Sequence, residues 1–248
     1  MRKKNLLFIP FILGIGIILS NCLGNMKNSV TLQDSPAVVS WNMLDGKTTI
    51  GIENIGYIAA PSITDVSEGD CILLRKYTID FDNQPSQEYF TATDIVKENV
   101  DQAFLEHLHS FSIGDYTLPI LNIEASVSPF YNGKIFIYAN CRDKNPDLRL
   151  IYNTADQETD NVKNFYLIAK PSSTDSNTKE TMTLKAFDLK YLAYSLGTDT
   201  TVIDQVTNEE INLKYLKANL RFFSKLSEKG DPEYLTFSSR FTMYFFRN

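Results

Sequence analysis

The chain has 248 residues, of which 43% are apolar and 12% aromatic, so it can bury a substantial core. Its 30 acidic side chains outnumber its 24 basic ones, which gives a formal net charge of −6. Nucleic-acid binding depends on Lys and Arg side chains that neutralise phosphates, so the acidic balance argues against a nucleic-acid partner.

Residues 1–21 have the organisation of a secretory signal peptide. Residues 2–4 read Arg-Lys-Lys, and residues 6–19 carry no charge. This run of about 14 residues is short for a membrane span, which needs about 20, but it suits the apolar core of a signal peptide. The following Leu-Ser-Asn-Cys22 resembles the lipobox of bacterial lipoproteins, in which the cysteine is acylated. The alternative is a cysteine buried in an N-terminal helix.

The lipobox resemblance implies that Cys22 is the lipid attachment site. Acyl chains, at about 0.8 kcal/mol per buried CH₂, would hold the protein on a membrane without a spanning helix. Removal of residues 1–21 takes away three basic residues and no acidic one, which leaves 21 basic against 30 acidic side chains, about −9. We therefore expect an exported cell-envelope protein, anchored at the outer membrane and facing the periplasm or the surface.

The first half of the expected mature chain changes character at Trp41. Residues 22–40 are polar and lack periodicity, which predicts a flexible tether. The run KTTIGIENIGYIAAP is strand-like, and its glycine and proline residues mark turns or strand ends. The run EGDCILLRKYTIDFDNQPSQEYFTATDIV predicts two strands joined by turn residues at 82–86. In the first of them both alternating sets mix apolar with polar residues, which is typical of a small barrel or an edge strand.

Residues 100–112 are the best candidate in this half for a helix or an irregular connector. Further strand-like runs follow at intervals of roughly ten to fifteen residues, with polar loops and no long helices between them. This spacing is typical of a sandwich or a barrel. The runs are LPILNIEASVS, GKIFIYANC, LRLIYN, NFYLIAKP and ETMTLKAFDL.

The C-terminal run YLTFSSRFTMYFF has the clearest alternation in the chain. Its period of two predicts one half-buried strand. Lys-Gly-Asp-Pro at residues 229–232 predicts a turn before it, and hence a terminal hairpin with a strand from about Ala218. Residues 211–223 also fit a helical face. The residues expected to share the apolar face are Leu235, Phe237, Phe241, Met243 and Phe245.

Three segments, placed behind a lipobox leader and a short tether, resemble the NigD-like lipoproteins of Bacteroidetes. They are EGDCILLRKYTIDFDNQ, SPFYNGKIFIYAN and FFSKLSEKGDPEYLTFSSRF, and the resemblance covers most of the mature chain as a pattern. It implies an OB-like barrel at residues 41–112 and a β-sandwich domain at residues 113–248. It brings no catalytic residues. The expected fold class is mainly β, with a small OB-like barrel followed by a β-sandwich domain.

Two cysteines remain besides the predicted anchor. Cys71 and Cys141 both lie in apolar strand-like runs, where a free thiol packs as a small hydrophobic side chain. An exported protein can instead oxidise such a pair to a disulfide. Their spacing leaves both alternatives open.

The sequence offers no recognisable constellation for catalysis. His107 and His109 would share a face in a strand, but no Cys or His lies near them to complete a metal site. No nucleophile motif or phosphate-binding glycine loop is recognisable. Four carboxylates could serve a hydrolase, although acidic residues in turns commonly bond to the backbone. They are Asp80, Asp82, Glu124 and Asp188. We expect no enzyme activity, no metal and no cofactor.

Aromatic side chains beside loops are the remaining candidates for ligand contact. Trp41, Phe130 and Tyr131 could stack on a glycan or anchor an envelope protein, or they could cap the core. We predict a non-catalytic, lipid-anchored envelope lipoprotein that binds or scaffolds. One alternative is a fimbrillin-like pilus or adhesion subunit that donates its C-terminal strand. Another is a glycan-active hydrolase.

Overall fold

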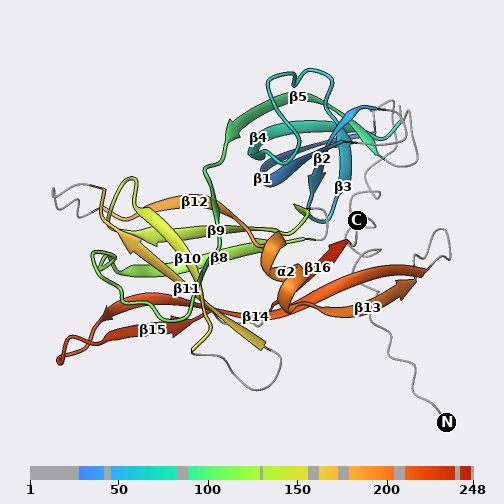
Figure 1. The fold of residues 1–248 in the computed structure, drawn as a ribbon. Helices are drawn as coiled ribbons and strands as arrows, with labels where there is room; N and C mark the ends of the chain where they lie inside the picture. Colours follow the sequence, from blue (N-terminus) through green and yellow to red (C-terminus); the bar gives the residue numbers. More distant parts are fainter. Residues whose placement is uncertain are drawn as a thin grey trace, which may run out of the picture.

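The computed structural model describes residues 28–41, 46–82, 89–128, 131–155, 162–172, 179–203, 210–237 and 241–246. Figure 1 shows that these residues form a small barrel placed above a β-sandwich. The predicted signal peptide lies outside the described residues. Within the described part of the chain, no helix combines the length and apolar character that a membrane span requires.

The N-terminal unit is a closed barrel with the strand order β1-β2-β3-β5-β4. The strands predicted between residues 47 and 99 are confirmed, and β4 and β5 are antiparallel neighbours. A small OB-like barrel was expected here, and the order and closure agree with it. The strands are β1 (Ser29–Trp41), β2 (Thr48–Ile52), β3 (Gly56–Ala59), β4 (Cys71–Asp80) and β5 (Phe90–Asn99).

The predicted tether is wrong for residues 29–40, because β1 occupies them. β1 pairs with β2 on one edge and with β4 on the other, so the barrel cannot close without it. Ala37, Val38 and Val39 are buried. The other residues of β1 are half-buried or exposed, and this made the segment look like a polar linker.

β4 changes its inward-facing side in the middle of the strand. The even-numbered Ile72 and Leu74 point into the barrel core, and so do the odd-numbered Tyr77 and Ile79. In a regular strand, odd and even positions would face opposite sides. The ladder with β5 shifts its register directly after Leu74, and an extra residue in a strand reverses which side chains face inward. Its partner β1 has a residue of positive φ, Asp34, opposite the same place. This bulge explains the mixed alternation of the sequence.

The C-terminal unit is a sandwich of two sheets. One sheet has the order β6-β12-β9-β8, and the other has the order β13-β14-β11-β10-β7. The strands predicted between residues 118 and 190 are confirmed. The strands are β6 (Gln102–Phe104), β7 (Glu106–Leu108), β8 (Ile120–Val127), β9 (Lys134–Cys141), β10 (Asp147–Asn153), β11 (Val162–Lys170), β12 (Thr181–Asp188), β13 (Thr198–Ile203) and β14 (Glu210–Leu226).

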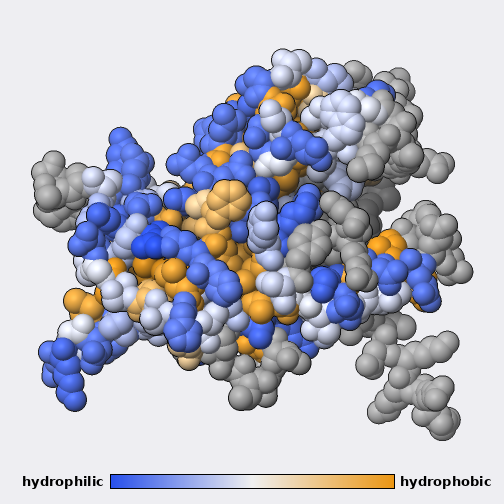
Figure 2. Space-filling model, viewed as in Figure 1, coloured by the Kyte–Doolittle hydropathy of each residue, from blue (hydrophilic) through white to orange (hydrophobic). Residues whose placement is uncertain are grey.

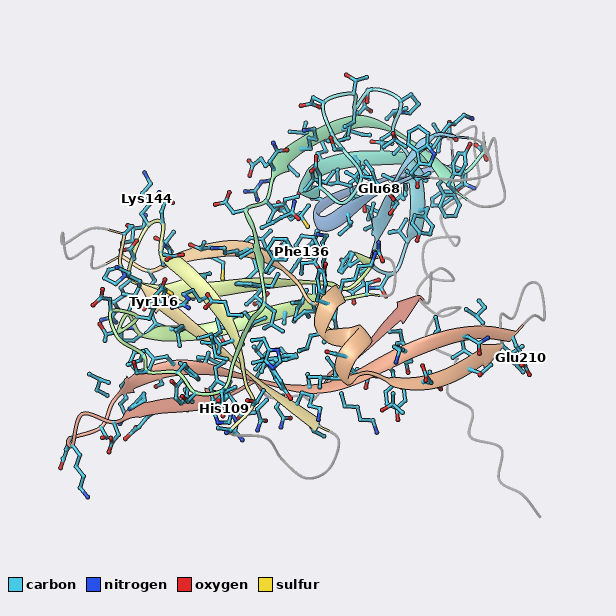
Figure 3. All side chains as sticks on the ribbon, in the orientation of Figure 1. Glu68, His109, Tyr116, Phe136, Lys144 and Glu210 are labelled. Atoms are coloured by element: carbon cyan, nitrogen blue, oxygen red, sulfur yellow. The ribbon has the colours of Figure 1, made fainter. Side chains whose placement is uncertain are left out.

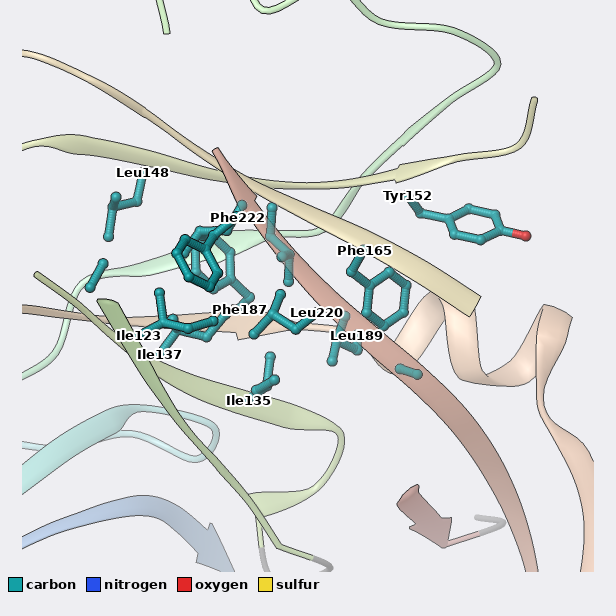
Figure 4. Packing of buried hydrophobic residues seen from close by; sticks show 14 of the residues in the cluster. Ile123, Ile135, Ile137, Leu148, Tyr152, Phe165, Phe187, Leu189, Leu220 and Phe222 are labelled. Carbon is teal, nitrogen blue, oxygen red and sulfur yellow. The ribbon is translucent and has the colours of Figure 1, made fainter. Parts of the chain in front are cut away.

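The core of the sandwich lies between its two sheets. Figure 4 shows Ile123, Ile135 and Ile137 from one sheet packed against Phe165 and Leu220 from the other. All five are buried side chains on inward-facing positions. The burial of such a contiguous apolar layer is the main force that holds two sheets face to face.

Residues 100–112 contain two short strands and no helix, so the helical alternative for this segment is wrong. β6 pairs in parallel with β12, and β7 pairs in parallel with β10. The segment therefore belongs to the sheets of the sandwich. A short helix that the sequence analysis missed, α2 (Lys190–Leu196), follows β12. Asp188 Oδ1 accepts the Lys190 N–H at 2.9 Å, as a cap at the start of a helix does.

The C-terminal hairpin is confirmed, but its last strand is interrupted. β15 (Pro232–Thr236) pairs with β14 at residues 221–226, and β16 (Phe241–Phe246) pairs with β14 at residues 213–218. The single apolar face is wrong, because Leu235 is 51% exposed whereas Met243 is 5% exposed. Because β15 and β16 pair with separate stretches of β14, the alternation of buried and exposed side chains does not continue from one strand to the other.

The barrel and the sandwich share a small apolar core. Val38, Cys71 and Leu73 of the barrel pack with Phe136 and Ala186 of the sandwich. Figure 3 shows Phe136 between the two units. Because this cluster is buried, separation of the units would expose apolar surface to water.

Candidate binding surface

The predicted site residues do not form one site. Cys22 and Phe130 lie outside the described residues, so lipid attachment stays a prediction. Trp41 lies at the end of β1, and its side chain is 52% exposed. Trp41 therefore stays a candidate contact residue, whereas Tyr131 does not.

Tyr131 is a core residue, so its assignment as a ligand contact is wrong. Its side chain is fully buried, and its ring packs edge-to-face on Phe136 with a centroid distance of 4.9 Å. Its hydroxyl donates to the Pro36 carbonyl oxygen of β1 at 3.2 Å and lies 3.3 Å from Ser126 Oγ. Burial raises the pKa of Tyr131 to about 12. The residue thus joins the sandwich to the barrel and caps the core.

Cys71 and Cys141 are free buried thiols, so the disulfide alternative is wrong. Cys71 belongs to the cluster between the two units, whereas Cys141 belongs to the core of the sandwich. Because they pack in separate clusters, the thiols act as small hydrophobic side chains. Burial raises the pKa of each thiol to about 12.

The two histidines lie on or beside β7 and have separate neighbours. The His107 ring lies 5.2 Å from the Tyr152 ring, and His109 Nδ1 lies 3.1 Å from Thr154 Oγ1. Among the residues that the structure describes, no three Cys, His, Asp or Glu side chains are grouped as metal ligands.

A groove between β6, β7 and α2 is the best candidate for a binding surface. Its volume is about 540 Å³, and we call it the aromatic groove. Figure 2 shows hydrophobic side chains exposed across the middle of the visible face. The residues that line the groove are Phe104, Leu105, His107, Asp188, Tyr191, Leu192 and Ser195.

Two aromatic rings of the groove are exposed to an unusual extent. The Phe104 side chain is 73% exposed, and the Tyr191 side chain is 88% exposed. Phe104 ends the short edge strand β6, so no further strand of the described sheet covers it. Tyr191 lies in the first turn of α2, whereas its neighbour Leu192 is buried in the sandwich core. Large exposed rings beside an apolar groove are typical of interaction surfaces.

Asp188 and Ser195 of the aromatic groove already have hydrogen-bond partners within the protein. Lys134 Nζ, in an adjoining hollow of about 60 Å³, donates to Asp188 Oδ2 at 3.1 Å and to Gln102 Oε1 at 3.0 Å. Asp188 Oδ1 caps α2 through Lys190. Ser195 Oγ donates to the Leu192 carbonyl oxygen at 3.0 Å. The groove therefore suits an apolar occupant better than one that needs many hydrogen bonds.

Sequence reasoning missed Phe104 and Tyr191. Phe104 was placed in a connector, and only the pairing of β6 with β12 shows that its ring stays outside the core. Tyr191 could have been found, because Leu189, Leu192 and Leu196 have the spacing of a helical face. That face contacts the core, so the intervening tyrosine has to point outward.

The barrel and its packing on the sandwich define a two-unit β protein with an OB barrel. Residues 27–93 match the model of a family described as a lipoprotein OB domain, so the barrel is similar to the OB domain of lipoproteins. The match begins before β1, which confirms that the barrel includes residues assigned to the tether. A search of curated protein sequences found no significant match.

Solved structures with TM-scores above 0.5 share the two-unit fold. An uncharacterised protein of Parabacteroides merdae is 15% identical with a TM-score of 0.62, covering 86% of this chain and 98% of that one. A candidate lipoprotein of Bacteroides fragilis is 14% identical with a TM-score of 0.55, covering 84% and 96%. The neighbours include a NigD-like immunity protein of Bacteroides caccae, 8% identical with a TM-score of 0.49 over 86% and 94%. The predicted fold class is confirmed.

Proposed function

We propose that this protein is a non-catalytic envelope lipoprotein that binds a partner protein through the aromatic groove. The observation that carries the proposal is the exposure of Phe104 and Tyr191 at the mouth of an apolar groove. The lipobox-like leader and the lipoprotein OB domain support an envelope location. The expected place is the outer membrane, with the acyl chains on Cys22 as the anchor.

A protein partner fits the aromatic groove better than a glycan does. Sugars bind through many hydroxyl groups, whereas Lys134 and Asp188 already bond to each other. The rings of Phe104 and Tyr191 offer apolar area with little conformational freedom to lose, as the anchors of protein interfaces do. The occupant that we expect is an apolar or aromatic side chain presented by an envelope protein.

The alternative functions receive less support. The C-terminal segment that a pilus subunit would donate is paired with β14 of the same chain, as β15 and β16. Three of the four candidate hydrolytic carboxylates have structural partners: Asp80 Oδ1 accepts the Asp82 N–H at 3.0 Å, Asp82 Oδ2 accepts the Asn28 N–H at 2.8 Å, and Asp188 is paired with Lys134. Turnover of a glycan that Asp188→Asn abolishes would establish the hydrolase instead.

The anchor is tested by metabolic labelling with an alkyne fatty acid. We expect the wild-type chain to take up the label and the Cys22→Ala variant to lose it. Label retained by the Cys22→Ala variant would show that the lipid is attached elsewhere or that the chain is not a lipoprotein.

The partner is tested by photocrosslinking in intact envelopes, followed by a binding measurement with the purified crosslinked protein. The double variant Phe104→Ala/Tyr191→Ala should bind at least tenfold more weakly, because loss of an interface anchor costs more than about 1 kcal/mol. The matched control is Leu226→Ala/Leu235→Ala, which removes exposed apolar side chains from the β14–β15 hairpin. Equal losses in both variants, or saturable glycan binding that only the first variant loses, would contradict a protein partner.

A further inference from the structure

A second groove lies between the barrel and the sheet β6-β12-β9-β8, and we call it the inter-unit groove. Its volume is about 380 Å³. Arg75 of β4, Glu98 of β5 and Asp101 of the connector line one side, and Met182 and Leu184 of β12 line the other. β6 follows Asp101 directly and separates this groove from the aromatic groove. Ligand sites are common at such junctions between units.

The floor of the inter-unit groove contains an open sheet edge. β12 pairs with β9 along residues 181–188, but it pairs with β6 only along residues 186–188. Among the described strands none pairs with residues 181–185 on that second edge. An uncovered edge is the usual template for strand addition.

Met182 and Leu184 of β12 direct their backbone N–H and C=O groups toward this open edge. The Ala186 N–H donates to the Asp101 carbonyl oxygen at 2.9 Å, on the side of β6. Backbone groups alternate sides along a strand, and the pairing of β12 with β9 has no register shift. The N–H and C=O of Met182 and Leu184 therefore point to the same edge as those of Ala186. These two residues are about 7 Å apart along the strand, which is the repeat of an extended peptide.

The net negative charge of the inter-unit groove favours a basic peptide over an acidic one. The Arg75 guanidinium donates to Asp34 at 2.9 Å and to Glu98 at 2.8 Å, so two carboxylates already share it. The carboxylate of Asp101 is the second one, beside Glu98, that lines the groove. Lys97 does not offset it, because its ammonium pairs with Asp65 at 3.1 Å. The groove lining thus holds one cation, which Asp34 outside the lining also shares, and two carboxylates, and this balance favours a positively charged occupant.

We propose that the open edge of β12 binds an extended peptide of a partner protein, rich in Lys or Arg, as an added strand. The peptide backbone bonds to Met182 and Leu184, and its basic side chains face Glu98 and Asp101. A glycan cannot reproduce the alternating donors and acceptors of a strand. This inference does not rest on the aromatic groove, since a separate surface carries it.

The test uses fluorescence anisotropy of two labelled hexapeptides, Lys-Val-Lys-Val-Lys-Val and Glu-Val-Glu-Val-Glu-Val, with the purified full chain. The basic peptide should bind saturably, and the acidic one at least tenfold more weakly. Met182→Pro removes one N–H from the open edge and leaves the β9 ladder intact, since proline is tolerated on edge strands. It should weaken the basic peptide about fivefold, as expected for one lost hydrogen bond, whereas Met182→Val should not.

A charge variant tests the same site without a change to β12. Glu98→Gln/Asp101→Asn keeps the backbone bond of Asp101 to Ala186 and should weaken the basic peptide about tenfold at low salt. Bound basic peptide should also slow hydrogen exchange of residues 181–185, and Phe104→Ala should change none of these results. Equal losses for Met182→Pro and Met182→Val, equal binding of the acidic peptide, or unchanged exchange would overturn the proposal. Self-association that Met182→Pro abolishes would assign the edge to a second copy instead.

Discussion

Replacement of Tyr131 should uncouple the barrel from the sandwich. The side chain is fully buried between the units, packs on Phe136 and bonds to Pro36 of β1. Tyr131→Ala should lower the free energy of unfolding by about 3–5 kcal/mol, as other buried aromatic-to-alanine changes do. Tyr131→Phe keeps the ring and loses only the hydroxyl bond, so it should cost about 1 kcal/mol. Each kcal/mol corresponds to about 2–4 °C in the melting temperature of a domain of this size.

Urea unfolding followed by two probes measures this effect. The chain has one tryptophan, Trp41, which reports the barrel, whereas far-ultraviolet circular dichroism reports both units. The two transitions should coincide in the wild type, and in Tyr131→Ala the barrel should unfold at lower urea. Tyr191→Ala is the control, because its exposed ring should change stability by less than about 0.5 kcal/mol. If Tyr131→Ala stays within 1 kcal/mol of the wild type with coincident transitions, the reasoning about this interface fails.

Two further predictions concern buried titratable groups. Asp143 is buried, which opposes its ionisation, but bonds from the Ser172 hydroxyl and from the Asn145 and Ser172 N–H groups lower its pKa. Its stabilisation is therefore present above the unfolded pKa of about 4 and is lost on acidification. Asp143→Asn should cost about 1–3 kcal/mol at pH 7 and much less at pH 3 in urea titrations, and a constant difference would contradict this. In a Cys22→Ser chain, Cys71 and Cys141 should resist Ellman's reagent at pH 8 and both react in denaturant, because burial raises each pKa to about 12; fast native reaction, or none in denaturant, would contradict the assignment.

Local pattern was sufficient to predict where most strands lie. β8 to β12 follow apolar runs separated by polar loops, and the turn at residues 227–231 forms the hairpin that its glycine and proline predict. These features depend on contacts within a few residues, which the order of side chains contains directly. The family resemblance correctly added the OB barrel, and the lipobox remains the reason to expect an anchor at Cys22.

Pairing between distant residues decided the candidate sites. Phe104 is exposed because β6 is a short strand at the edge of its sheet, and Tyr131 is buried because the barrel lies against it. Neither fact is visible in the neighbouring residues of the chain. The same holds for the β6 segment, which covers only the last part of β12 and leaves an open edge.

The sequence by itself determined a β-rich chain with a lipobox-like leader, since alternation, turn residues and hydrophobic length are local properties. Only the tertiary structure decided which side of each strand meets water. Register shifts between Leu74 and Thr78 accompany the reversal of the faces of β4, and β1 enters the barrel although its first half is polar. The physical reason is that the burial of a side chain depends on which strands become neighbours. The pairing of the strands is determined by the free energy of folding of the whole chain.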